Sequence, residues 1–300
     1  MANYINLKQS LEHIHTLPAM PAIAKKMLTL ALNTDEGETQ LLKLIAQDPQ
    51  ISARIIGLSN ASLFGSPGMI SSISDAAMRL GLTQIKSVAI GIATVSAFTK
   101  PPEGELKARD LWTHSITIAS VMRTMAKHMP ARIRPMEDQI FLAGLLHDIG
   151  YNVLNFIAKD LSDTLHERLR TTSEASLLEI EHELLGTDHG EIGAQLGIHW
   201  GLPAEIITVM RHHHMPDTMG PDINQSLARL VNVAEKMLPD LAMVEHSAQE
   251  ITEQEWVKLG IDPREVDTIA EEVEACLLYT SNKRLLCSFM FTNIFNHRPD

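Results

Sequence analysis

The chain has 300 residues, of which 45% are apolar and 21% charged, and its formal net charge at pH 7 is −12. This composition is typical of a globular protein long enough to bury its own core, and it excludes a disordered or collagen-like chain. The acidic balance argues against a nucleic-acid surface that works by neutralising phosphates. The two cysteines, Cys276 and Cys287, are too few for a disulfide framework or a thiolate zinc site.

No targeting segment is visible at the start of the sequence. Residues 1–15 contain no basic stretch that leads into an apolar run, so no signal peptide is expected. No stretch reaches about 18 uninterrupted apolar residues, the length that a membrane-spanning helix needs. Together with the low cysteine content, these features predict a cytoplasmic protein that does not enter a membrane.

The N-terminal part of the chain has the pattern of short, closely connected helices. Apolar residues recur at helical spacing, aromatic residues make up only 4% of the chain, and alternating runs typical of strands are absent. Asp48, followed by a proline, predicts a helix start. Ser74 or Asp75 is expected to open a short helix that Gly81 closes, and Thr83 to open the next one.

Longer helices are expected beyond the Pro- and Gly-containing segment 100–104. One should cover 105–128, a second should lead into His147, and a third should begin at His189 behind the N-cap Asp188. Later helix starts are predicted at Pro203, Asp222 and Asp262. We therefore expect an all-α fold with an N-terminal helical part (1–103), a helical bundle (104–240) and a C-terminal helical extension (241–300). Segment 281–300 has no assignable role.

Histidines are concentrated in the predicted bundle: of the 14 in the chain, ten lie between residues 114 and 214. The candidate metal ligands are His114, His147, Asp148, His189, His212, His213 and Glu235. Imidazole and carboxylate ligands suit zinc, iron, manganese or nickel, and helical bundles build such sites from one ligand per helix. We expect His114, His147, Asp148, His189 and either His213 or, as second choice, His212 to meet at one point. At a helix end before Gly150, Asp148 could bridge two metal ions.

Each of these residues also has an ordinary structural interpretation. A single histidine on an apolar helix face is usually hydrogen-bonded within the core. The run 212–214 could be a polar helix end, where protonated imidazoles complement the helix dipole. The acidic group Glu179, Glu181 and Glu183 is expected to be a solvated face. Surface or helix-end positions are expected for His128, His166, His182, His199, His246 and His297. The metal interpretation is favoured because the candidates recur near helix ends or on inner faces.

Several segments, in order along the chain, resemble the HDOD domain. They are 17–21 (LPAMP), 45–49 (IAQDP), 59–65 (SNASLFG), 73–81 (ISDAAMRLG), 144–150 (GLLHDIG), 189–194 (HGEIGA), 200–203 (WGLP) and the pair 212–213. The resemblance covers about residues 10 to 240. It implies an all-helical fold related to the HD superfamily of metal-dependent phosphohydrolases, and a bacterial signalling or regulatory module without established catalysis.

The resemblance also implies roles for particular residues. The same candidate ligands fall on the metal-ligand positions of catalytic HD and HD-GYP relatives, with Glu235 in place of a later aspartate. Tyr151 stands where the HD-GYP pattern has a lysine, and the GYP triplet is absent. A tyrosine offers a phosphoryl group only a neutral donor, which argues against efficient catalysis. Tyr151 and Arg211 are the candidate substrate-binding residues.

Three functions are compatible with the sequence. The favoured one is a signalling module whose bundle carries a retained or vestigial site for one or two divalent metal ions and whose helical surface binds a partner signalling protein, with no efficient turnover of nucleotides. The alternative is a metal-dependent phosphohydrolase that acts on a nucleotide or cyclic nucleotide, because bound metals can polarise phosphoryl groups and activate water. The third is a helical scaffold without metal. No nucleic-acid or membrane partner is expected, and a homo-oligomer stays open.

Overall fold

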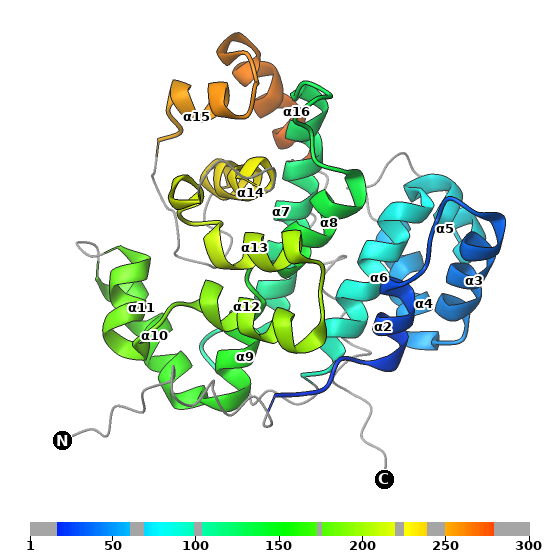
Figure 1. The fold of residues 1–300 in the computed structure, drawn as a ribbon, viewed down its shortest axis with the longest axis horizontal. Coiled ribbons are helices and arrows are strands. Elements are labelled where there is room, and N and C mark those ends of the chain that lie inside the picture. The colour runs from blue at the N-terminus through cyan, green and yellow to red at the C-terminus, as the bar shows by residue number, and fades with distance from the viewer. Residues whose placement is uncertain are drawn as a thin grey trace.

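The structure is a computed structural model that describes residues 17–60, 69–98, 104–172, 176–219, 225–238 and 250–278. Every regular element in these ranges is a helix, and none of the described residues lies in a β-strand. Figure 1 shows the helices packed around α7 and α8, with the N-terminal helices to one side. The predicted all-α fold is therefore confirmed.

The helices follow one another with short connections. In chain order they are α2 (Ala22–Leu28), α3 (Asp35–Ala46), α4 (Pro49–Ser59), α5 (Ile73–Leu80), α6 (Leu82–Ser96), α7 (Ala108–His128), α8 (Glu137–Leu146), α9 (Ile149–Ile157), α10 (Lys159–Thr171), α11 (Leu177–Leu185), α12 (His189–Trp200), α13 (Ala204–His212), α14 (Gln225–Met237), α15 (Glu253–Lys258) and α16 (Val266–Leu278). Two 3₁₀ turns, η3 (Pro216–Thr218) and η4 (Pro263–Glu265), precede α14 and α16.

Helices α2 to α6 form the N-terminal lobe, coloured blue to cyan in Figure 1. Its core is apolar, with Leu41, Ile45 and Ile55 completely buried. The inner face of α6 packs against α8, so the lobe is attached directly to the bundle. The start of α4 is as predicted: the Asp48 carboxylate accepts hydrogen bonds from the backbone N–H groups of the first turn at 2.9 and 3.0 Å.

Two predicted helix starts in this lobe were wrong. Helix α5 begins at Ile73, because the Ser72 hydroxyl caps it: its oxygen accepts from the Asp75 backbone N–H at 3.1 Å and its proton is donated to the Asp75 carboxylate at 2.7 Å. Helix α6 begins at Leu82 and not behind Thr83. Gly81 ends α5 and starts α6 with a φ of 86°, which lets the chain turn between the two helices without a connecting loop.

The bundle is centred on α7, which packs along α8 and α14. Helix α7 ends at His128 as predicted but begins at Ala108, three residues later than expected. The stretch Glu137–Ile157 has 21 residues and a mean hydropathy of 1.4, enough by length and composition for a membrane span. Its most apolar window is 89% buried inside the protein, however, so this stretch is the centre of the bundle.

The C-terminal helices α15 and α16 cover one end of the bundle. Helix α16 packs on α7, and the His128 ring lies 3.1 Å from a Glu265 oxygen and 3.3 Å from a Glu272 oxygen. Asp262 caps a 3₁₀ turn, and not directly a helix, before α16 follows. The helix start expected at Asp222, segment 281–300 and the proposed domain boundaries near residues 103 and 240 lie outside the described residues, so the domain division stays a prediction.

Candidate metal centre

His147 and Asp148 lie at the junction between α8 and α9. Helix α8 ends at Leu146, and the backbone of Asp148 (φ −99°, ψ 13°) leaves helical geometry before α9 begins. Two consecutive side chains on a regular helix would point about 100° apart. The break removes this restriction, so both side chains reach the same buried point.

Four imidazoles surround the Asp148 carboxylate. Nε2 of His147 lies 3.0 Å and Nε2 of His114 lies 3.4 Å from Oδ2, while Nε2 of His189 lies 3.3 Å and Nε2 of His213 lies 3.5 Å from Oδ1. The histidines come from α7, the end of α8, the start of α12 and the end of α13. The predicted convergence is confirmed, with His213 as the residue chosen first; that these side chains bind metal stays a prediction.

The side chains form two groups that share Asp148. The first group is Asp148, His189, His213 and His214, and the second is His114, His147, Asp148 and Glu235; within each, the candidate ligand atoms lie within 4.8 Å of one another. We call the seven residues together the Asp148 cluster. None of their side chains is more than 8% exposed. The cluster is therefore a polar centre inside the bundle.

Hydrogen bonds on the outer side of the rings orient the imidazoles. His147 and His213 each donate Nδ1–H to the carbonyl oxygen three residues earlier, at 2.9 and 3.0 Å. Metal-binding histidines characteristically use one ring nitrogen this way, which fixes the tautomer and leaves the lone pair of the other nitrogen for the metal. Both Nε2 atoms consequently face Asp148.

Glu181 plays the same part for His189. Its carboxylate accepts from the His189 Nδ1–H at 2.9 Å and from the His189 backbone N–H at 3.1 Å, and it is completely buried. The expectation of a solvated acidic face was wrong for this residue and right for Glu179 and Glu183, which are exposed. The sequence contains the signal: Glu181 lies four residues after Leu177 and four before Leu185, both buried on the inner face of α11.

The end of α13 contributes His213, as expected, and His214 in place of His212. Helix α13 stops at His212, whose half-exposed ring belongs to neither group. His214, which the sequence interpretation did not choose, places Nε2 2.9 Å from Nε2 of His189. The adjacent rings of His213 and His214, in the turn that follows α13, lie together at the cluster with centroids 4.1 Å apart.

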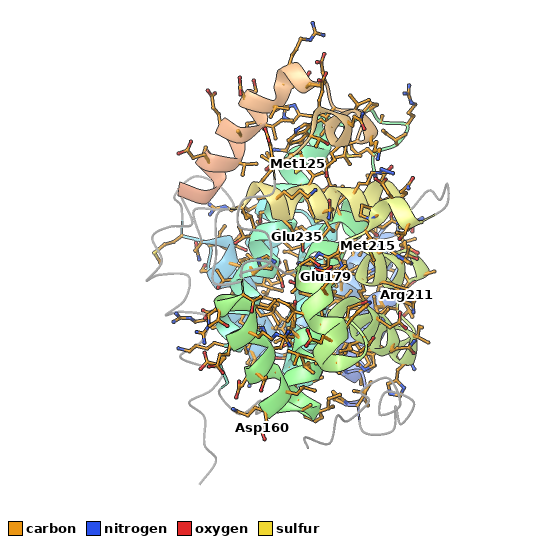
Figure 2. All side chains as sticks on the ribbon, turned by 90° about the vertical axis from the view of Figure 1, so that its left-hand side faces the viewer. Met125, Asp160, Glu179, Arg211, Met215 and Glu235 are labelled. Carbon is orange, nitrogen blue, oxygen red and sulfur yellow. The ribbon has the colours of Figure 1, made fainter. Side chains whose placement is uncertain are left out.

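The two predicted substrate residues do not lie together. Tyr151 is completely buried and stacks on the His189 ring, with centroids 4.3 Å apart and planes 17° from parallel. Arg211 lies at the outer edge of the bundle, where Figure 2 shows it away from Glu235, and its Nε–H donates to Glu191 at 2.6 Å. The structure thus places Tyr151 behind a cluster ligand and Arg211 in a surface ion pair.

Close backbone packing holds the cluster in place. A Cβ atom added to Gly150 would lie 1.9 Å from the His189 carbonyl oxygen, a distance that no side chain tolerates. Gly150 therefore allows α9 to approach the start of α12 closely enough for Asp148 and His189 to meet. Larger residues at this position would separate these two elements.

The charges of the cluster are strongly coupled. Burial lowers the pKa of His147, but the negative charges of Asp148 and Glu235 outweigh it and raise this pKa to about 10. Burial raises the pKa of Asp148, whereas the positive charge of His147 and the surrounding imidazole donors hold it well below its ordinary value. A cation beside Asp148 is therefore strongly favoured, and in the metal-free protein a proton supplies it.

The residues fit a divalent metal. Both Asp148 oxygens and Nε2 of His114 and His147 are buried, and within the described part of the chain none of them has a hydrogen-bond partner of regular geometry. Nε2 of His189 faces Nε2 of His213 at 3.2 Å, close to the roughly 3.3 Å separation of two nitrogens around one tetrahedral zinc-type ion. Facing ring nitrogens repel unless a proton or cation lies between them. The donor set thus matches imidazole–carboxylate metal sites.

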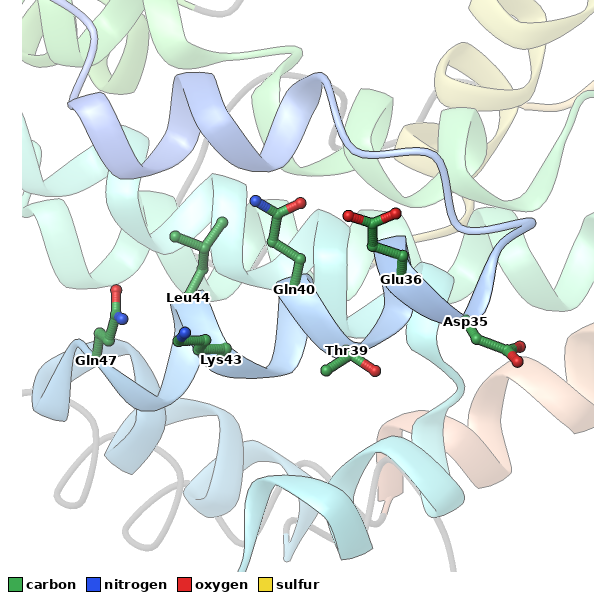
Figure 3. Close-up of a pocket in the computed structure, with 7 residues that line it drawn as sticks. All are labelled: Asp35, Glu36, Thr39, Gln40, Lys43, Leu44 and Gln47. Atoms are coloured by element: carbon green, nitrogen blue, oxygen red, sulfur yellow. The ribbon is translucent and has the colours of Figure 1, made fainter.

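A separate hollow lies on the N-terminal lobe, far from this cluster in the fold. Figure 3 shows that its lining residues, among them Asp35, Gln40 and Lys43, all lie on or directly after α3. A single helix cannot enclose a ligand, and none of these residues contacts the Asp148 cluster. The bundle, and not this surface, carries the candidate chemistry.

The sequence profile of the HDOD domain matches residues 17–216. This chain therefore belongs to the HDOD domain family, as its sequence motifs suggest.

Solved structures of similar fold extend over almost the whole chain. A candidate signal transduction protein from Marinobacter aquaeolei VT8 is 25% identical, with a TM-score of 0.77 over 95% of this chain and 61% of its own. An HDOD domain protein of unknown function from Geobacter sulfurreducens is 24% identical, with a TM-score of 0.74 over 97% and 99% of the two chains. A candidate phosphohydrolase from Shewanella amazonensis SB2B is 22% identical, with a TM-score of 0.66 over 97% and 99%.

Among curated proteins, an uncharacterized protein of Treponema pallidum (strain Nichols) is 22% identical over 203 residues, which is 68% of this chain. The matching region spans only 38% of that relative, and this chain spans 61% of the Marinobacter protein. Both relatives therefore contain further sequence that this chain does not match.

Proposed function

We propose that the protein is an HDOD-type signalling module in which the Asp148 cluster holds one or two divalent metal ions and whose output is the binding of a partner protein. The observation that carries this proposal is the pair of ligand groups that share Asp148. The name of the Marinobacter relative, a candidate signal transduction protein, supports the same class of function.

Each group would hold one ion. His189, His213 and His214 would bind the first, and His114, His147 and Glu235 the second, with Asp148 between them. Imidazole and carboxylate donors without thiolate suit iron, manganese, zinc or nickel. When bound, such ions polarise phosphoryl oxygens and lower the pKa of coordinated water. Glu181 and the backbone carbonyls that accept from Nδ1–H would keep the rings in position.

Binding rather than turnover is supported by the surroundings of the cluster. Tyr151 stacks behind His189 and cannot replace the lysine of catalytic HD-GYP relatives. The deep burial of all seven residues restricts direct contact with a substrate as large as a nucleotide. We expect such a module to act in the cytoplasm on a protein partner and not on nucleic acid.

A metal-dependent phosphohydrolase is the second candidate. Two ligand groups that share one carboxylate are what a two-metal phosphoesterase needs, and the Shewanella structures of similar fold include a candidate metal-dependent phosphohydrolase. Because these structures are 20 to 22% identical to this chain, they support the fold and not the reaction.

Elemental analysis of the purified full chain tests the proposal. We expect one or two equivalents of a first-row metal, lost in the Asp148→Ala variant and retained in Asp160→Ala, a matched change of an exposed aspartate. Activity should then be screened with added manganese or iron. Absence of metal under all loading conditions would contradict the module with a metal centre. Turnover near about 10 per second that requires Asp148 would establish the phosphohydrolase instead.

A further inference from the structure

A pocket of about 280 Å³ lies next to the Asp148 cluster, where the end of α13, the turn η3, α14 and α15 meet. One wall is His214, the cluster residue whose Nε2 lies 2.9 Å from His189. Asn232 of α14 also lines it and donates to the His214 carbonyl oxygen at 3.4 Å. Figure 1 shows α13, α14 and α15 stacked in this order at this end of the molecule. The pocket and the candidate metal site thus share His214.

The pocket gathers positive charge in an acidic protein. Arg229, Lys236 and Lys258 line it, against the carboxylates of Asp217 and Glu255. The chain as a whole carries a net charge of −12, so an excess of cations at one pocket is a local exception. Arg229 and Lys236 are largely covered, with side chains 12% and 13% exposed, so both are held in the pocket wall.

One carboxylate serves two of these cations. Asp217 pairs with Arg229 and, at 2.7 Å, with Lys258, while Lys236 pairs with Glu255 at 2.5 Å. The hydrogen bond from Lys258 and the charge of Arg229 hold the pKa of Asp217 below its ordinary value, which keeps the carboxylate ionised. The Asp217 side chain is 62% exposed, so solvent can take over its hydrogen bonds if another anion binds to Arg229 and Lys258. The Asp217 carboxylate therefore occupies the position that an incoming anion would take.

We propose that this pocket binds the phosphate group of a small phosphorylated ligand. A phosphate dianion can accept from the planar Arg229 guanidinium through two oxygens and from the Lys258 ammonium through the third, and it brings twice the charge of the carboxylate that it displaces. Asn232 supplies a neutral donor beside them. The pocket volume accommodates the phosphate and a few further atoms, and not a whole dinucleotide.

This proposal rests in part on the proposed function, in which His214 is a ligand of the metal centre. A phosphorylated ligand in the pocket would then lie against one of the metal ligands. The binding itself requires only the pocket cations. In this way the module would sense a phosphorylated metabolite beside its metal ions.

Isothermal titration of the full chain with inorganic phosphate tests the proposal, in metal-free and in metal-loaded protein. We expect binding in both, weakened about tenfold or more in Arg229→Met, because a charge-assisted bidentate contact is lost. Lys258→Met should weaken it as well, and this half-exposed residue provides a second variant if Arg229→Met does not fold. Asp217→Asn should bind phosphate several-fold more tightly, since the competing carboxylate is gone. Arg264→Met, a change of an exposed arginine outside the pocket, should leave the affinity unchanged.

The alternative outcomes are distinguishable. The proposal is overturned if phosphate binds neither the metal-free nor the metal-loaded protein. It is also overturned if phosphate binds equally well after Arg229→Met and Lys258→Met. If phosphate binds only the metal-loaded protein and binding is lost in Asp148→Ala, the phosphate binds to the metal. This result overturns the phosphate-binding pocket as proposed and supports the metal centre. Binding that depends on Arg229 in a protein that takes up no metal supports the pocket and contradicts the proposed metal centre.

Discussion

The N-terminal lobe and the Asp148 cluster are equally buried but chemically opposite. The lobe is filled with Leu41, Ile45 and Ile55, whose burial stabilises the fold without any ligand. The cluster buries carboxylates and imidazoles, and such groups are costly inside a protein unless each charge is compensated. The lobe therefore needs no explanation beyond stability, whereas the cluster is understandable as a site prepared for a cation.

The largest expected loss of stability comes from a substitution in the N-terminal lobe, and it should leave the Asp148 cluster unaffected. Leu41→Ala in the lobe should lower the free energy of unfolding by about 2 to 5 kcal/mol, because it leaves a cavity in a tightly packed core. Metal should still raise the melting temperature of this variant as it does in the parent protein, since the two sites share no contact. Calorimetric melting with and without metal measures both quantities. Loss of the metal response in Leu41→Ala would mean that lobe and cluster are one coupled unit.

Substitution of Asp148, in contrast, should remove the stabilisation by metal. Metal at a hundredfold excess over its dissociation constant should stabilise the parent protein by about 2.7 kcal/mol, through binding to the folded state alone. Asp148→Ala should abolish this stabilisation, and the exposed control Asp160→Ala should retain it. Thermal unfolding at fixed metal concentration is the measurement. A full metal response in Asp148→Ala would show that Asp148 is not a ligand and that the histidines alone, among them His213 and His214, hold the metal.

A smaller effect on metal affinity is expected from Glu181, which contacts the candidate ligand His189. Glu181→Gln should weaken metal binding about 10- to 100-fold, since the amide holds the His189 ring less firmly and makes it a weaker ligand. Glu183→Gln, a change of an exposed glutamate on the same helix, should leave the affinity unchanged. Competition with a chelator of known affinity provides the values. Equal affinities in both variants would show that the buried contact of Glu181 only stabilises α11.

The pH dependence should have opposite signs with and without metal. In the metal-free protein the pKa of His147 is raised from 6.5 to about 10, so its contribution to stability is complete below pH 6.5 and is lost as pH rises towards 10. Metal must displace this proton, so metal affinity should increase over the same range, by about tenfold per pH unit for each proton released. Unfolding and chelator titrations between pH 6 and 9 compare the two. A metal affinity independent of pH would contradict a ligand role for His147.

Many helix boundaries in the lobe and the bundle were predictable because their signals are local. The proline after Asp48, the N-cap Asp188 and the end of α7 at His128 each depend on a few neighbouring residues, and the structure has them as expected. The convergence on Asp148 was predictable because helix ends and inner faces recur beside the histidines. The exchange of His212 for His214 was not, since it depends on how the turn after α13 directs two adjacent rings.

Glu181 and the pocket residues show two further limits of sequence reasoning. Glu181 stands among exposed glutamates, and only its spacing with Leu177 and Leu185 distinguishes it. Arg229 and Lys258 belong to different helices and meet over Asp217 only through the packing of α15 on α14. Neither the charge count nor a motif predicts such a meeting, because it is a property of the tertiary structure.

The stretch Glu137–Ile157, which carries His147 and Asp148, also has a consequence for how the chain is made. It leaves the ribosome after α6 and α7, which pack on α8, but before α12, α13 and α14, so part of its apolar surface is still uncovered at that stage of synthesis. The ligands extend from His114 to Glu235, and neither group is complete until α12 and α13, or α14, have followed. The proposed metal centre can therefore form only after these later helices have been made, and the uncovered apolar surface is prone to aggregation until then.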